Sequence, residues 1–161
     1  MSIVYDDIRA ALEVTLASIP NMPPIAWENK SFTPDTAVGY IQVRQLPTAR
    51  RPTVRGLNPQ QRYQGVFQLL VKMPENKGPN PSQIVVAALI KAFEATTDVV
   101  YSNTSNSLLL ESGSSLLLQD GSRVLLDQIT YVTIDYTEQV GGFTDSPFYT
   151  IPVNVNWYSY K

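Results

Sequence analysis

Two long segments alternate apolar and polar residues with a period of two, and this pattern constrains the fold more than any other feature. In residues 62–73 and again in 147–160, the side chains at alternate positions are largely aromatic or aliphatic. Successive side chains of a β-strand point to opposite faces, so each segment is predicted to be a strand with one buried face. β-branched and aromatic runs predict further strands at 38–46 and 128–140. Because Pro152 lacks an amide hydrogen, it indicates an edge strand or a neighbour that needs no amide there. The predicted buried faces carry Tyr63, Phe67, Leu69, Val71 and Met73 in the first segment, and Tyr149, Ile151, Val153, Val155 and Trp157 in the second.

Residues 3–18 are predicted to form an amphipathic helix. Their apolar side chains recur at steps of three and four, which places them in one stripe. Asp6 and Asp7 fall in the first turn, where the helix dipole favours negative charge. Pro20 ends the segment because it cannot continue a helix. The two acids therefore have an ordinary structural role in this interpretation.

A second helix is predicted at 81–96. Asn80 is a suitable capping residue and Pro81 suits the first helical position. Apolar residues, including Ile84, cover more than half of the circumference, so we expect this helix to be deeply buried.

The order of these elements predicts the α+β class: a mainly antiparallel β-sheet with two helices packed on it, and a small inserted β-meander. With 161 residues the chain is long enough for one hydrophobic core. We therefore expect residues 1–161 to form a single domain, with the insert at 107–127. The insert is expected to join the second helix to the next strand, and its two ends should lie close together.

The composition argues against an enzyme. The chain has no cysteine and no histidine, which removes the commonest metal ligands and the commonest general base. The carboxylates at Asp6, Asp7, Asp127 and Asp135 suggest no catalytic pair. We expect no catalytic, cofactor or metal site. The acidic N-terminus and the short apolar runs predict neither a signal peptide nor a membrane span, so the chain is expected in the cytoplasm or in an assembly built there.

Residues 107–127 contain an internal repeat. Leu-Leu-Leu followed by a Gly-Ser turn recurs after eight residues, and a third copy is degenerate. Three leucines are too few for a helix, so the repeat predicts a β-meander in which Leu109 and Leu117 share one face and the other leucines occupy the opposite face. A meander this small cannot bury both faces, so one should lie on this domain or on a neighbouring chain. The alternative is a duplicated surface loop that the fold tolerates.

Several motifs together resemble a known family. The chain contains W-x-N-x-x-F-T-P, then Y-I-x-V-x-x-L-P, then an arginine with G-x-x-Q-x-x-V, an Ala-rich helix and a final aromatic strand with P-V-x-V. This pattern resembles the tail terminator proteins of long-tailed phages with non-contractile tails, and the Leu-rich insert departs from it. The motifs occupy residues 27–34, 40–47, Arg62 with 65–71, 82–95 and 148–157.

The resemblance implies a structural role in the phage neck. Such proteins form a ring, usually hexameric, that caps the tail tube, ends its polymerisation and offers a docking surface to the head-tail connector or stopper protein. DNA passes through the lumen without specific binding. The implied location is the head-proximal end of the virion tail, after assembly in the host cytoplasm. The alternatives are another ring-forming neck, tail-tube or head-completion subunit, or a monomeric binding module for glycan or peptide with an aromatic face.

An arginine-rich segment, residues 47–62, is the strongest candidate interface. It has four arginines and no acid. An arm of this length without structure of its own is usually functional, so we expect it to contact an acidic surface on a ring neighbour or on the tube. A solvated loop and a DNA-phosphate contact are the alternatives. The expected interface residues are Arg50, Arg51, Arg55, Arg62, Leu109 and Leu117.

Overall fold

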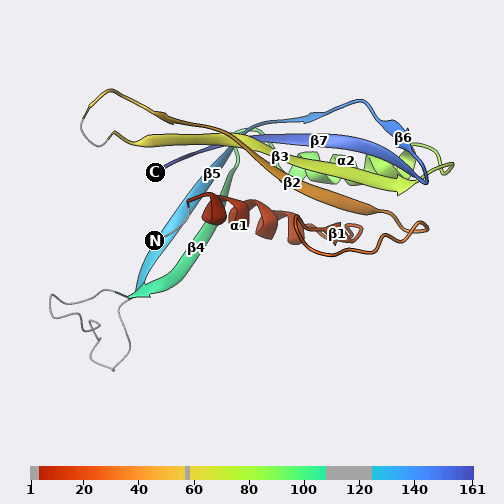
Figure 1. The fold of residues 1–161 in the computed structure, drawn as a ribbon, viewed down its shortest axis with the longest axis horizontal. Coiled ribbons are helices and arrows are strands. Elements are labelled where there is room, and N and C mark those ends of the chain that lie inside the picture. The colour runs from red at the N-terminus through yellow and green to blue at the C-terminus, as the bar shows by residue number, and fades with distance from the viewer. Residues whose placement is uncertain (1–3, 57–58, 108–124) are drawn as a thin grey trace.

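The computed structural model describes residues 4–56, 59–107 and 125–161, which form a curled sheet and two helices (Figure 1). The sheet order is β1-β2-β3-β7-β5-β4, with β6 paired to β7. Every pairing is antiparallel except that of β1 with β2. The predicted α+β fold with a mainly antiparallel sheet is therefore confirmed. The elements are α1 (Val4–Ala17), β1 (Ile25–Ala26), β2 (Tyr40–Pro52), β3 (Gln61–Pro74), α2 (Asn80–Ala92), β4 (Asp98–Ser107), β5 (Leu125–Gln139), β6 (Phe143–Asp145) and β7 (Phe148–Tyr160).

Three strands were not expected from the sequence: β1, β4 and β6. β4 is the longest of them, and most of its residues after Tyr101 are Ser, Asn or Thr, so it lacks an apolar period. It becomes a strand because β5 pairs with it from Asp98 to Ser107. A partner that is distant in sequence therefore decides its conformation.

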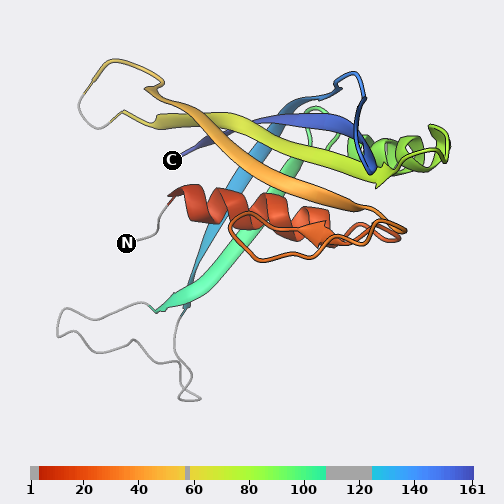
Figure 2. The same cartoon turned by 45° about the vertical axis from the view of Figure 1, so that its right-hand side comes forward.

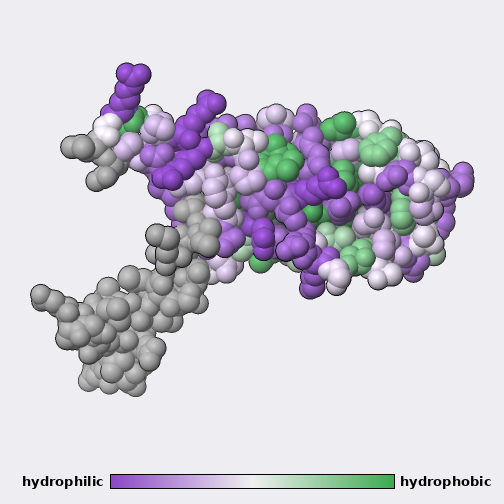
Figure 3. Space-filling model, viewed as in Figure 1, coloured by the Kyte–Doolittle hydropathy of each residue, from purple (hydrophilic) through white to green (hydrophobic). Residues whose placement is uncertain are grey.

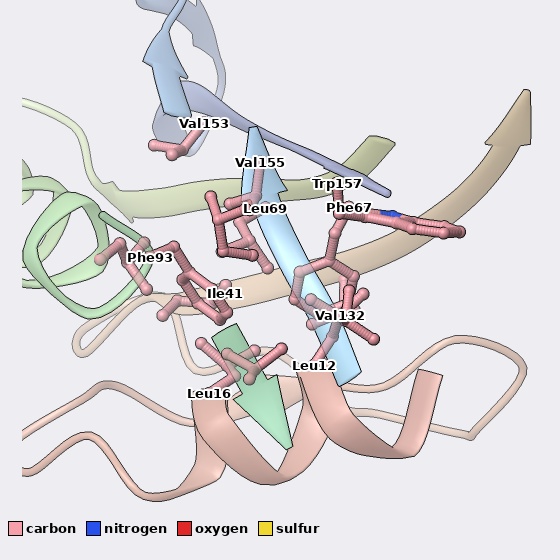
Figure 4. Close-up of a cluster of buried hydrophobic side chains, with 14 of the residues drawn as sticks. Leu12, Leu16, Ile41, Phe67, Leu69, Phe93, Val132, Val153, Val155 and Trp157 are labelled. Carbon is pink, nitrogen blue, oxygen red and sulfur yellow. The ribbon is translucent and has the colours of Figure 1, made fainter. Parts of the chain in front are cut away.

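The core lies between the helices and one face of the sheet. From α1, Ile8, Leu12 and Leu16 are completely buried, as the predicted stripe requires. Figure 4 shows Leu12 and Leu16 rising from α1 toward side chains of the strands. In β3 the predicted alternation is confirmed, since Phe67 and Leu69 are fully buried. Both helices contribute to this one cluster.

The second helix departs from its prediction in two ways. Its N-cap is Pro79, without a side-chain cap, and Asn80 is already helical. Deep burial is also wrong, because Ile84 is 71% exposed while Val86 and Leu89 face the core. One side of α2 packs on the sheet and the opposite side faces solvent, so apolar residues around most of the circumference do not imply burial on all sides.

Pro152 lies in a central strand and not at an edge. β7 pairs with β3 on one side throughout its length. On its other side, β6 pairs with residues up to Thr150 and β5 with residues from Val153. The Val140 amide donates to the Pro152 carbonyl at 2.9 Å. A residue's amide and carbonyl point to the same side of a strand, so the missing hydrogen faces the gap between β6 and β5.

Candidate functional site

Two β-hairpins, β2–β3 and β4–β5, project beyond the helices at the same end of the molecule (Figures 1 and 2). The first contains the arginine-rich segment. β2 continues to Pro52 and pairs there with Gln61 of β3, so the prediction of an arm without structure of its own is wrong. β7 extends alongside β3 as far as Tyr160. The backbone hydrogen bonds of three strands therefore hold the base of this hairpin, and only its tip lies beyond them.

A β-bulge bends β2 where the hairpin begins. The register shifts between Pro47 and Ala49, and Thr48 donates its hydroxyl hydrogen to the Gln64 carbonyl at 3.1 Å. A bulge bends a strand and increases its twist. The hairpin is thus directed away from the sheet by a feature built into β2 itself.

The arginines of the hairpin lie on two different faces. Arg50 is the cross-strand partner of Tyr63, and its guanidinium lies 5.4 Å from that ring centroid. Arg51 is the partner of Arg62, so these two share the opposite face. The Arg62 guanidinium lies 4.6 Å from the Tyr158 centroid. Arg55 is exposed, beyond the paired strands.

No carboxylate neutralises these four arginines in the described residues, where the ion pairs are Arg9–Glu13 and Lys72–Asp145. The projecting hairpin is strongly hydrophilic over its surface (Figure 3). The structure therefore brings the four positions together on one hairpin but does not gather them into a single patch.

The second hairpin, β4–β5, exposes an apolar face. Val99 and Val132 are buried toward the core, whereas Val100, Ile129 and Tyr131 on the reverse side are 43–55% exposed. Among the described strands, β4 lies at an edge of the sheet, so one side of its backbone has no neighbouring strand there. An apolar face beside an open edge is typical of a surface that another protein covers.

The Leu-rich insert begins and ends at the tip of this hairpin. Ser107 and Leu125 are paired, so the two ends of the insert lie close together, as expected. The segment 108–124 joins β4 to β5, which corrects the expectation that the insert joins the second helix to the next strand. Ser107 and residues 125–127, which were predicted to be part of the insert, belong to β4 and β5. Leu109 and Leu117 lie outside the described residues, and the predicted meander stays a prediction.

The W-x-N-x-x-F-T-P motif has a packing role. Phe32 lies 5.0 Å from the Tyr40 ring, and Tyr40 lies 5.3 Å from Phe148. Glu28 accepts a hydrogen bond from the Gln45 amide at 3.3 Å, which ties the motif to β2. Trp157 is only 2% exposed. Trp27 and Phe32 of the motif are half-buried against the hydrophobic clusters, and Trp157 is buried, so these aromatic side chains contribute to packing.

The described residues offer no cluster of three or more acidic groups that could hold a metal ion. Asp6 and Asp135 are exposed and Asp7 is largely buried; the side chain of Asp127 lies outside the described part. In that same part of the chain, neither helix is long and apolar enough to cross a membrane.

Comparison with known proteins decides the family. The sequence profile described as phage tail terminator protein matches residues 7–157. This chain belongs to the phage tail terminator family. The terminator is therefore a structural component of the phage tail, from a family that is structural and not enzymatic. Membership also implies contacts with tail and head components.

The fold also has a counterpart among solved structures. The alignment with one solved structure covers 99% of this chain and 97% of the solved chain. The TM-score is 0.58 and the sequence identity is 22%. At this identity the similarity concerns the fold alone. No curated protein matches the sequence.

The arginines are evident in the sequence, but their arrangement on the hairpin is not. The strand predicted at 62–73 already includes Arg62 and Tyr63, so one arm of a hairpin was present in the prediction. The Gly56 region carries the turn signal for the tip. These two features together could have predicted a hairpin, whereas the facing of Arg51 and Arg62 depends on the bulge.

Proposed function

We propose that the terminator assembles into a hexameric ring that caps the tail tube and ends its polymerisation. The observation that carries this proposal is the pair of projecting hairpins, one basic and one with an apolar face. Because the two surfaces differ, each would meet a different surface of its neighbour. Such head-to-tail contacts close into a ring when the rotation between subunits allows it.

The same ring would provide the docking surface for the head-tail connector or stopper protein. It would occupy the head-proximal end of the tail after assembly in the host cytoplasm. DNA would pass through the lumen without specific binding. The net charge of −2 supports this, because binding to DNA grows with each phosphate that a basic residue neutralises.

We assign the interface to the two hairpins. Arg50, Arg51, Arg55 and Arg62 would contact an acidic surface on a neighbour or on the tube. Leu109 and Leu117, in an inserted β-meander at 107–127, would extend the apolar face of β4–β5 onto an adjoining chain. Residues 1–161 would act as one domain.

Electron microscopy of the purified protein and of tails assembled in its presence tests the proposal. A ring with a central hole is expected, and tails should have one length. The triple variant Arg50→Ser, Arg51→Ser, Arg55→Ser should remain folded yet fail to fix tail length. Its matched control is Arg44→Ser, an exposed position on β2 before the bulge.

Two outcomes would contradict this assignment. Tails of normal length with the triple variant would remove the arginine hairpin from capping. A wild-type protein that neither forms rings nor changes tail length would refute the terminating ring itself. Salt should weaken the contact in the wild type, because exposed charge pairs are screened.

A further inference from the structure

Arg51 and Arg62 place two positive charges directly opposite each other on neighbouring strands. They are direct cross-strand partners on β2 and β3, so their side chains leave the sheet on the same face. Like charges directly opposite each other destabilise a strand pair. In the described residues neither guanidinium has a carboxylate within ion-pair distance.

The surroundings of this pair form a recess. It has a volume of about 330 Å³ and is lined by Arg51, Arg62, Gln64, Tyr160 and the 52–53 segment. The Tyr158 and Tyr160 rings pack edge to face at 5.6 Å, and Arg62 lies over Tyr158. This aromatic support holds the Arg62 guanidinium in place.

Arg62 also has an unused donor. Its Nε is enclosed and has no hydrogen-bond partner among the described residues. A buried donor without an acceptor costs free energy, and an anion in the recess would in addition offset the repulsion between the two guanidinium groups. The arrangement is therefore prepared for an anionic group.

We propose that the Arg51–Arg62 recess binds a carboxylate side chain of an adjoining protein subunit. Guanidinium groups bind carboxylates through paired hydrogen bonds, and one carboxylate can accept hydrogen bonds from two arginines. A DNA backbone needs a row of basic groups, yet Arg50 lies on the other face of the hairpin. The hairpin is therefore suited to one carboxylate group and not to a row of backbone phosphates.

The identity of the partner rests on the assembly role proposed above, whereas the recess itself does not. The carboxylate belongs to a second copy of this chain, because the residues outside 47–62 carry 14 acidic against 8 basic side chains; the tail tube protein is the other outcome of the test. Both sources offer the same chemistry, and the experiment separates them.

The first measurement uses fluorescently labelled poly-L-glutamate and fluorescence anisotropy with the full chain. Arg51→Gln should weaken binding about ten- to hundredfold, the usual effect of losing hydrogen bonds to a charged group. Arg44→Gln is the matched control, since it removes the same charge from the same strand outside the recess. Arg62→Gln should show the same loss, with its fold checked by circular dichroism.

The second measurement identifies the source. If Arg51→Glu prevents self-association, the carboxylate comes from a second copy; if it prevents only co-sedimentation with tail tubes, it comes from the tube protein. Poly-L-glutamate binding that depends on Arg51 in a protein without rings would support the recess and count against the ring.

Three results would overturn the proposal. The first is equal loss of poly-L-glutamate binding in Arg51→Gln and Arg44→Gln, which would show general charge attraction. The second is unchanged poly-L-glutamate binding in Arg51→Gln. The third is a labelled DNA duplex that binds through Arg51 when poly-L-glutamate does not, which would assign the recess to phosphate.

Discussion

Replacing Gly65 with alanine should destabilise the terminator at the base of the arginine hairpin. Gly65 lies on β3 between Pro47 of β2 and Trp157 of β7. A Cβ atom added there would lie 2.6 Å from the Trp157 indole and 2.7 Å from the Leu46 carbonyl oxygen. The indole is 2% exposed and the carbonyl belongs to a paired strand, so neither can move away easily.

The magnitude follows from this double contact. Overpacking a core costs about 1–3 kcal/mol, and contact with backbone places Gly65→Ala near the upper limit. The loss of glycine's freedom in the unfolded chain offsets about 0.4–1 kcal/mol. The net destabilisation is roughly 2 kcal/mol, which lowers Tm by about 4–8 °C for a domain of this size.

Thermal and urea unfolding followed by circular dichroism measure this change. Gly56→Ala is the matched control, because no atom of the described residues lies within 4 Å of its added Cβ. Its stability should equal that of the wild type or exceed it by up to about 1 kcal/mol. Gly142→Ala should fall between the two, since its Cβ meets the Tyr149 hydroxyl at the end of a side chain that can rotate. If Gly65→Ala has the same Tm as the wild type, the claim that Trp157 leaves no room for a side chain at position 65 is refuted.

Three further changes test other parts of the fold. Leu12→Ala should cost about 2–5 kcal/mol in chemical unfolding, because Leu12 is fully buried, whereas Val14→Ala on the same helix, 56% exposed, should be nearly neutral. Burial raises the pKa of Glu13 despite Arg9 nearby, so the neutral form contributes stability at low pH that is lost as the pH rises through the raised pKa. The Tm of Glu13→Gln should therefore increase relative to that of the wild type as the pH is raised from the acid range. A short Gly-Ser linker in place of residues 108–124 should keep the fold by circular dichroism and weaken assembly by native mass spectrometry; loss of folding would place the insert in the core.

Local periodicity was enough to predict α1, β3 and β7. Burial on one face imposes a spacing that can be read along the chain, and Leu12, Phe67 and Val155 are all fully buried as that spacing requires. The position of a strand within the sheet cannot be predicted from this spacing. The Pro152 sequence allowed an edge strand or a permissive neighbour, and only the break between β6 and β5 decides between them.

Some features of the candidate site can likewise be predicted from the sequence, and others depend on the tertiary structure. The absence of cysteine and histidine, the family motifs and the concentration of arginines are properties of the sequence alone. That Arg51 faces Arg62 while Arg50 faces Tyr63 depends on the register of β2 against β3, which one bulged residue shifts. β4 depends likewise on β5, which follows it only after the 108–124 segment. Side-chain spacing is a local property that each segment carries, whereas register, edges and facing charges arise only when distant strands pair.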